Sequence, residues 1–274
     1  MIETLPRDGS FGARLVQALS TSSFGVGGAK FRVGGKEGPA DTVVFGCFRR
    51  EVFDEVGLFD ERLVRNQDYE FNRRLARAGK RIWLNPAIKV QYYNQATLGG
   101  LFKQAFGTGK WNPWTWYVAP YAFAARHAVP GIFVVGLFLV FSLWSLVSWG
   151  WIAAAAVLVP YFVLAFLASF QQAKRFRSNP VSSSPSSSIP PSSVFPPPSS
   201  PPSSLPPSSF LSPHSSFLLF LLLPPLFFAY HFSYGLGTLW GALRLLVGAT
   251  PVQKIREPWP GAGRFRAWPN PNRK

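Results

Sequence analysis

Two long runs without a charged side chain constrain the fold more than any other feature of this 274-residue chain. Residues 128–149 and 151–170 contain no Asp, Glu, Lys or Arg, and each approaches the roughly 20 residues that cross a bilayer. Arg126 precedes the first run and the basic stretch 174–177 follows the second. The positive-inside rule then predicts a transmembrane helical hairpin over residues 126–177, with both outer ends in the cytoplasm. A buried helical core of a soluble domain is the alternative interpretation.

The charge balance points to an anionic partner. The chain has 28 Lys and Arg against 12 Asp and Glu, a formal net charge of +16, which suits nucleic acid, an anionic membrane or a phosphorylated substrate. The basic residues are scattered through 1–126 and return at 174–177 and 244–274, on both sides of the apolar runs. This placement favours a cytoplasmic face against anionic lipid and no nucleic acid. The N-terminus carries no signal peptide pattern.

The second half of the chain divides by composition. Residues 178–216 are almost entirely Ser and Pro, a segment expected to be disordered with polyproline II bias. A ligand for proline-binding domains, a tolerated insertion and a shifted reading frame all remain open for it. Residues 217–249 are apolar but interrupted by two prolines, long for one membrane crossing and short for two, and a basic tail follows at 250–274. His231 is expected to be a polar residue at the membrane interface.

The pattern of residues 1–125 is α/β, with short connections. The β-branched and aromatic run 41–48 predicts a buried strand with the only cysteine, Cys47, in the core. A short helix follows over residues 49–57. A second helix opens at Asn66 and ends at Gly79, with Phe71, Leu75 and Ala78 facing inward and Arg73, Arg74 and Arg77 facing outward.

Two further strands and a loop complete this pattern. Residues 81–84 and 88–93 predict strands separated by a turn at Asn85-Pro86. Residues 1–40 are rich in Gly and Ser. The glycine-rich stretch 24–35 is expected to be a mobile surface loop rather than a phosphate cradle, because it lacks a preceding strand and the known glycine spacings.

Three motifs follow one another within residues 41–111. The first runs from Asp41 to Glu61 and contains Arg49-Arg50-Glu51, the second spans residues 65–79 and contains Gln67-Asp68, and the third spans residues 100–111. Together they resemble the C-terminal half of inverting, GT-A-fold family 2 glycosyltransferases, most nearly the succinoglycan-type exopolysaccharide group. The resemblance covers about residues 1–125. It implies an α/β fold, the acceptor-side half of a GT-A domain, followed by transmembrane helices.

The resemblance assigns roles to individual residues. Asp68 would be the catalytic base, and an inverting transfer needs such a base to take the proton from the acceptor hydroxyl. A carboxylate in the first turn of a helix is held in place there and favoured by the helix dipole. Substrate-binding roles fall on Gln67, Gln104, Lys110, Trp111, Arg49 and Arg50. Two alternatives stay open: Asp68 as a simple helix-start carboxylate, and residues 104–116 as an amphipathic segment at the membrane interface.

The family uses Mg²⁺ or Mn²⁺ to neutralise the leaving diphosphate, through an Asp-x-Asp motif in its nucleotide-binding half. Asp68-Tyr69-Glu70 lies outside that context, so no metal site is predicted in this chain. The expected function is transfer of a sugar from a nucleotide sugar to a lipid-linked or polysaccharide acceptor at the cell (inner) membrane. The chain is expected to be truncated, as the product of a split or mis-called gene, and inactive alone. A non-catalytic membrane partner subunit, or a degenerate remnant, is the alternative.

Overall fold

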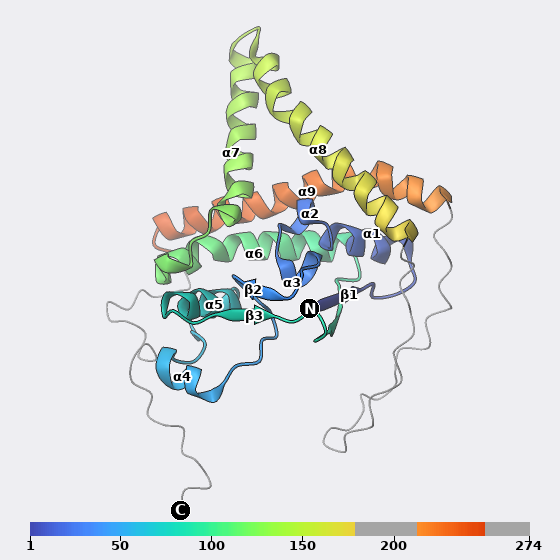
Figure 1. The fold of residues 1–274 in the computed structure, drawn as a ribbon. Helices are drawn as coiled ribbons and strands as arrows, with labels where there is room; N and C mark the ends of the chain where they lie inside the picture. The colour runs from blue at the N-terminus through green and yellow to red at the C-terminus, as the bar shows by residue number, and fades with distance from the viewer. Residues whose placement is uncertain (179–212, 250–274) are drawn as a thin grey trace, which may run out of the picture.

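A computed structural model describes residues 1–178 and 213–249 of the chain, and most of these residues are helical (Figure 1). The elements follow in the order β1 (Ile2–Leu5), α1 (Phe11–Ser20), α2 (Ser23–Val26), α3 (Lys30–Val33), β2 (Gly38–Ala40), α4 (Arg50–Val56), α5 (Gln67–Arg77), β3 (Ile82–Leu84), β4 (Val90–Tyr93), α6 (Leu98–Val118), a 3-10 turn η1 (Pro120–Ala122), α7 (Ala125–Leu146), α8 (Gly150–Ser178) and α9 (Pro213–Leu246). The Ser/Pro segment at 179–212 and the tail at 250–274 lie outside the described residues.

The strands are few and short. β1 pairs in parallel with β4, placing Ile2 opposite Val90, and β2 pairs antiparallel with β3, placing Gly38 opposite Leu84. Each sheet has two strands. The strands expected around residues 82 and 90 are confirmed. The first 125 residues thus contain more helix than strand, with two small sheets.

Residues 41–48 are not the buried strand that their composition predicts. They form an irregular segment in which Phe45, Gly46 and Cys47 are exposed. The Asn72 side-chain Nδ2 donates to the Val43 carbonyl at 2.6 Å and to the Thr42 hydroxyl at 2.9 Å. The Asn72 side chain of α5 therefore supplies a hydrogen bond to this backbone that a neighbouring strand would otherwise supply. Cys47 is a surface thiol and not a core residue.

The N-terminal 40 residues hold more regular structure than their glycine content suggests. Helix α1 is capped by Ser10, whose Oγ accepts from the Ala13 amide at 3.1 Å, as expected for an N-cap. Its Leu15, Val16 and Leu19 are buried against Leu219, Leu223 and Phe227 of α9 and form the largest apolar cluster.

Helices α4 and α5 begin and end where their local signals predict. Gly57 and Gly79 terminate them with φ of +89° and +74°, values that suit glycine. Phe71 and Leu75 of α5 are buried with Val56 of α4. The predicted faces of α5 are wrong in two places, since Ala78 is exposed and Arg74 is buried.

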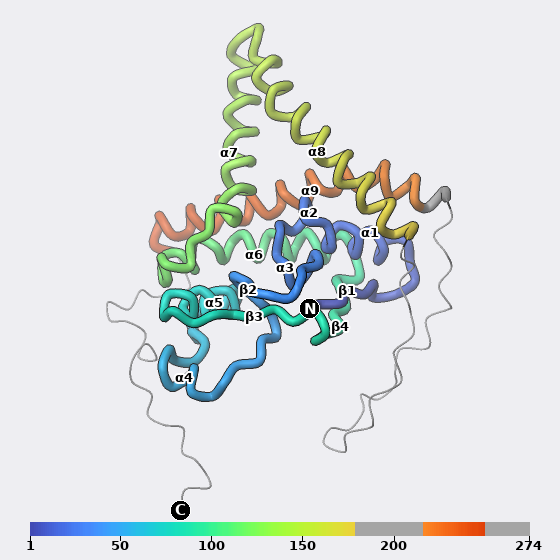
Figure 2. The backbone as a smooth tube through the Cα atoms, viewed as in Figure 1, coloured from blue at the N-terminus to red at the C-terminus, as the bar shows by residue number. Residues whose placement is uncertain are grey.

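Three helices are long and apolar enough to cross a membrane: Ala125–Leu146, Gly150–Ser178 and Ser216–Leu246. This agrees with the predicted hairpin, because α7 and α8 project together from the rest of the chain and meet at a tip (Figure 1). The segment 217–249 forms one continuous helix through Pro224 and Pro225. Figure 2 shows α9 crossing the base of the hairpin beside α6.

Candidate functional site

Asp68 lies in the first turn of α5 and is half-buried. Its Oδ1 accepts from the Tyr69 amide at 2.8 Å, so the carboxylate meets one of the free amides at the helix start. Burial raises the pKa of Asp68, while backbone amides and the nearby Arg32 guanidinium act in the opposite direction. A carboxylate with a raised pKa is a stronger proton acceptor than one in bulk water.

The start of α5 is fixed by Asn66. This residue adopts a left-handed conformation, with φ +65° and ψ +13°, which Asn tolerates better than most residues. Its side chain does not cap the helix. Instead its Nδ2 donates to Asn112 Oδ1 at 3.0 Å and lies 3.4 Å from the Thr115 hydroxyl. Asn66 therefore attaches the helix that carries Asp68 to α6.

Asn112 extends this attachment to the apolar helices. It is almost fully buried in α6. Its Nδ2 donates to the Tyr234 hydroxyl of α9 at 2.8 Å and lies 3.5 Å from the His127 carbonyl of α7. A buried amide is stable only with its polar atoms paired. Asn112 pairs both its side-chain oxygen and its side-chain nitrogen. One side chain thus joins α5, α6, α7 and α9. The sequence motifs did not identify it.

Glu70 lies in a different environment from Asp68. It is buried and accepts two bonds from Arg74, at 3.0 and 2.8 Å, and a third from the Tyr121 hydroxyl. Burial and the adjacent Glu70 raise the pKa of Tyr121, which therefore keeps its proton and donates. Because these partners occupy the Glu70 carboxylate, Asp68 and Glu70 do not fit a divalent ion between them. Within residues 1–178 and 213–249, no three His, Cys, Asp or Glu side chains group as metal ligands.

The α6 residues singled out by the third motif lie along one helix. Gln104 is half-buried, and the Lys110 ammonium lies 5.4 Å from the ring centroid of Trp114. Trp111 is buried and packs edge-on against Trp114 at 4.8 Å. Arg65, which precedes Asn66, lies against the same helix, since a Cβ added at Gly107 would meet its Cζ at 3.5 Å.

The remaining predicted residues do not all gather here. Gln67 is exposed beside Asp68. Arg49 and Arg50 are exposed at the start of α4, which lies on the side of α5 remote from α6 (Figure 1). The structure therefore brings the start of α5 and helix α6 together and leaves Arg49 and Arg50 apart from them. Arg65, the first residue of the second motif, and Arg32 are cations to which the motif analysis assigned no role.

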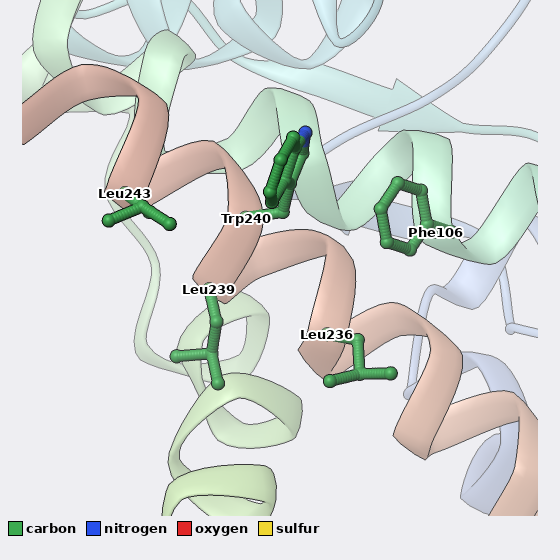
Figure 3. A pocket seen from close by; sticks show the side chains of 5 residues that line it. All are labelled: Phe106, Leu236, Leu239, Trp240 and Leu243. Carbon is green, nitrogen blue, oxygen red and sulfur yellow. The ribbon is translucent and has the colours of Figure 1, made fainter. Parts of the chain in front are cut away.

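A shallow apolar hollow lies on the outer side of α6 and α9. It is lined by Phe106, Leu236, Leu239, Trp240 and Leu243 (Figure 3). Phe106 stands four residues, or about one helical turn, before Lys110. An apolar hollow with a nearby cation suits a hydrocarbon chain that carries an anionic group.

Two curated proteins are similar to part of this chain. The succinoglycan biosynthesis protein ExoA of Rhizobium meliloti (strain 1021) is 39% identical over 89 residues, which cover 32% of this chain and 27% of that protein. The dolichyl N-acetyl-alpha-D-glucosaminyl phosphate 3-beta-D-2,3-diacetamido-2,3-dideoxy-beta-D-glucuronosyltransferase of Methanococcus voltae is 32% identical over 71 residues, covering 26% of this chain and 22% of that protein.

The chain thus spans about a quarter of the length of the curated relatives it matches. No family model matches it, and no solved structure matches it. The two similarities support a glycosyltransferase family, and the three apolar helices suggest a membrane protein.

Proposed function

We propose that this chain supplies the acceptor side of a membrane-bound, inverting glycosyltransferase, with Asp68 as the base. The observation that carries the proposal is the half-buried carboxylate in the first turn of α5, whose position is fixed by the partly buried Asn66–Asn112 bond. The partial similarity to two sugar-transfer or polysaccharide proteins supports the same class of reaction.

The reaction assigned to Asp68 is a proton transfer. The carboxylate takes the proton of an acceptor hydroxyl while that oxygen attacks the anomeric carbon of the donor sugar, and the nucleoside diphosphate leaves from the opposite face. Burial raises the pKa of Asp68, which brings its proton affinity closer to the working pH. The short link from Asn66 to α6 holds the base at a fixed place beside the membrane helices.

The acceptor we propose is lipid-linked, or a polysaccharide held at the membrane. The hollow at Phe106 and Trp240 would take a hydrocarbon chain (Figure 3), and Lys110 and Arg65 would meet its phosphate. Gln67, Gln104 and Trp111 are proposed to contact the donor, a nucleotide sugar. We also propose that the chain forms the acceptor side of a GT-A domain and that its site faces the cytoplasm at the cell (inner) membrane.

A divalent ion has no assigned step here. Mg²⁺ or Mn²⁺ would neutralise the leaving diphosphate, but Glu70 is committed to Arg74 and Tyr121. We therefore expect the ion and most of the donor contacts to come from a nucleotide-binding half, and we expect the chain by itself to transfer no sugar.

The test joins the chain to a nucleotide-binding half from a similar protein, by fusion or co-expression, and measures transfer of a radiolabelled sugar to membrane lipid. Asp68→Asn keeps the size and polarity of the side chain but removes the proton acceptor, so activity should fall by about 10²–10⁴-fold. Asp54→Asn is the matched control, because Asp54 is an exposed carboxylate on α4. Asp60 is unsuitable as a control, because it is buried and both its carboxylate oxygens accept from Arg62 in a bidentate ion pair at 2.6–3.1 Å.

Three outcomes would count against the proposal. Full activity of the Asp68→Asn fusion would show that the base is elsewhere. Transfer by the unaided chain would show that nothing is missing from it. Equal loss in the Asp54→Asn control would attribute the effect to folding.

A further inference from the structure

We infer that α9 lies along the membrane surface and is not a third crossing, so that only the hairpin of α7 and α8 spans the bilayer. By length and composition alone, α9 is as good a candidate span as the other two helices. What decides against a crossing is where α9 makes its contacts. The inference is independent of any sugar transfer.

Helix α9 stays in contact with the N-terminal unit along most of its length. Near its start, Leu219 is buried against α1. Near its middle, His231 Nε2 lies 2.9 Å from the Phe24 carbonyl. Near its end, the Gly241 carbonyl accepts from Trp114 Nε1 at 3.0 Å. From residue 219 to 241 the helix rises by about 33 Å, slightly more than the roughly 30 Å hydrocarbon thickness of a bilayer. A crossing helix would leave the surface unit within its first turns.

On the side of the N-terminal unit, α9 packs against α6, a helix with the composition of a membrane-surface helix. α6 contains Lys103 and Lys110 together with several tryptophans, a composition typical of the interfacial region. The two helices touch at their backbones: a Cβ added at Gly237 would lie 2.1 Å from the Phe106 carbonyl, and one at Gly241 would lie 2.2 Å from the Lys110 carbonyl. α9 cannot reach the bilayer centre while it stays against this helix.

The hairpin gives the depth of α9. α9 passes the first turns of α7, where a Cβ added at Gly235 would lie 2.2 Å from the Pro130 carbonyl. From Pro130 to the last residue of α7, Leu146, the helix rises by about 24 Å. Adding half the diameter of α9 gives about 30 Å. The hairpin together with half the thickness of α9 thus matches the hydrocarbon layer, so α9 lies at the boundary of that layer.

This position explains why α9 lacks the polar face of an ordinary surface helix. Its inner side is covered by α1, α2 and α6, so it meets no water there. Its uncovered side carries exposed large apolar residues: Phe217, Leu218, Leu221, Leu243 and Leu246. These residues fit the acyl chains of a lipid bilayer. It follows that the end of α9 lies on the same side of the membrane as Asp68.

Single-cysteine labelling tests the topology in the full chain, after Cys47→Ser removes the exposed native thiol. Ser148→Cys places a thiol at the hairpin tip, Val247→Cys at the end of α9, and Glu61→Cys in the N-terminal unit, all at exposed positions. An impermeant maleimide should label Val247→Cys and Glu61→Cys in inverted vesicles, and Ser148→Cys in intact cells. Labelling of Val247→Cys together with Ser148→Cys would overturn the inference, and so would labelling of all three from one side.

A depth measurement tests the same inference without relying on vesicle orientation. Spin labels at Leu221 and Leu243 are separated by 22 residues, or about 33 Å along α9. If α9 lies along the surface, oxygen and nickel accessibilities should place both labels within about 10 Å of the same depth. A label at exposed Leu139 of α7 supplies the deep reference. A depth difference near 33 Å would refute the inference.

Discussion

Replacing Arg74 by Met removes one partner of a buried ion pair and should increase the local unfolding of α5. The Arg74 guanidinium donates twice to Glu70, at 3.0 and 2.8 Å, and once to the Val56 carbonyl at 2.8 Å. Glu70 is only 1% exposed. In the variant its carboxylate keeps the Tyr121 hydroxyl as a donor but has no opposite charge.

The cost follows from that burial. Breaking a buried pair by removing one partner costs about 3–5 kcal/mol, because the remaining charge stays desolvated. Stabilities of single domains are about 5–15 kcal/mol, so the loss should be visible as local opening. Replacing both members, Glu70→Leu with Arg74→Met, should cost less than the single change, since no charge is then left buried.

Hydrogen exchange followed by mass spectrometry measures this opening in detergent-solubilised protein. Peptides covering residues 66–78 should lose about 3–5 kcal/mol of protection in Arg74→Met. Arg77→Met is the control, because Arg77 is exposed and lies 5.3 Å over the Tyr121 ring, a contact worth about 0.5–1 kcal/mol. A loss below 1 kcal/mol in Arg74→Met, or an equal loss in Arg77→Met, would refute the reasoning.

Three further predictions concern the site and the helix packing. Burial raises the pKa of folded Asp68, so the stability gained from its protonated form is present below the unfolded value near pH 4 and is lost as pH rises through the folded pKa. In the Asp68→Asn variant, residues 66–78 should therefore be more protected against hydrogen exchange than in the parent at pH 7. At about pH 3 the two proteins should be equally protected. Gly237→Leu should lower stability by about 1–3 kcal/mol because it forces α6 and α9 apart, whereas Gly136→Leu, with open space at its Cβ, should not change thermal unfolding. Asn112→Leu should cost about 1–3 kcal/mol, seen as faster exchange at the start of α5, because Asn66 loses its acceptor.

The elements predicted correctly are those with local signals. The two long apolar helices α7 and α8 follow from the absence of charge over 128–149 and 151–170, and the ends of α4 and α5 follow from Gly57 and Gly79. Each signal lies within the element it defines or directly after it, so no distant partner is needed to interpret it.

The misses involve partners far away in the sequence. Residues 41–48 have strand composition, but a strand needs a neighbouring strand, and here Asn72 satisfies the Val43 carbonyl instead. Arg74 lies on a face that its charge predicts to be exposed, yet it is buried and its Nη1 donates to the Val56 carbonyl, 18 residues earlier, at 2.8 Å. The role of Asn112 depends on Asn66 and Tyr234, 46 and 122 residues away. No local periodicity encodes such contacts.

The core of α1 has a consequence for the order of synthesis. Leu19 is buried by Leu223 and Phe227, which are made about 200 residues later. At about 5–20 residues per second, this interval lasts about 10–40 s. During that time the apolar face of α1 has no α9 to cover it, and the hairpin of α7 and α8 has already been made. The N-terminal unit therefore completes its core only after the hairpin has been synthesised.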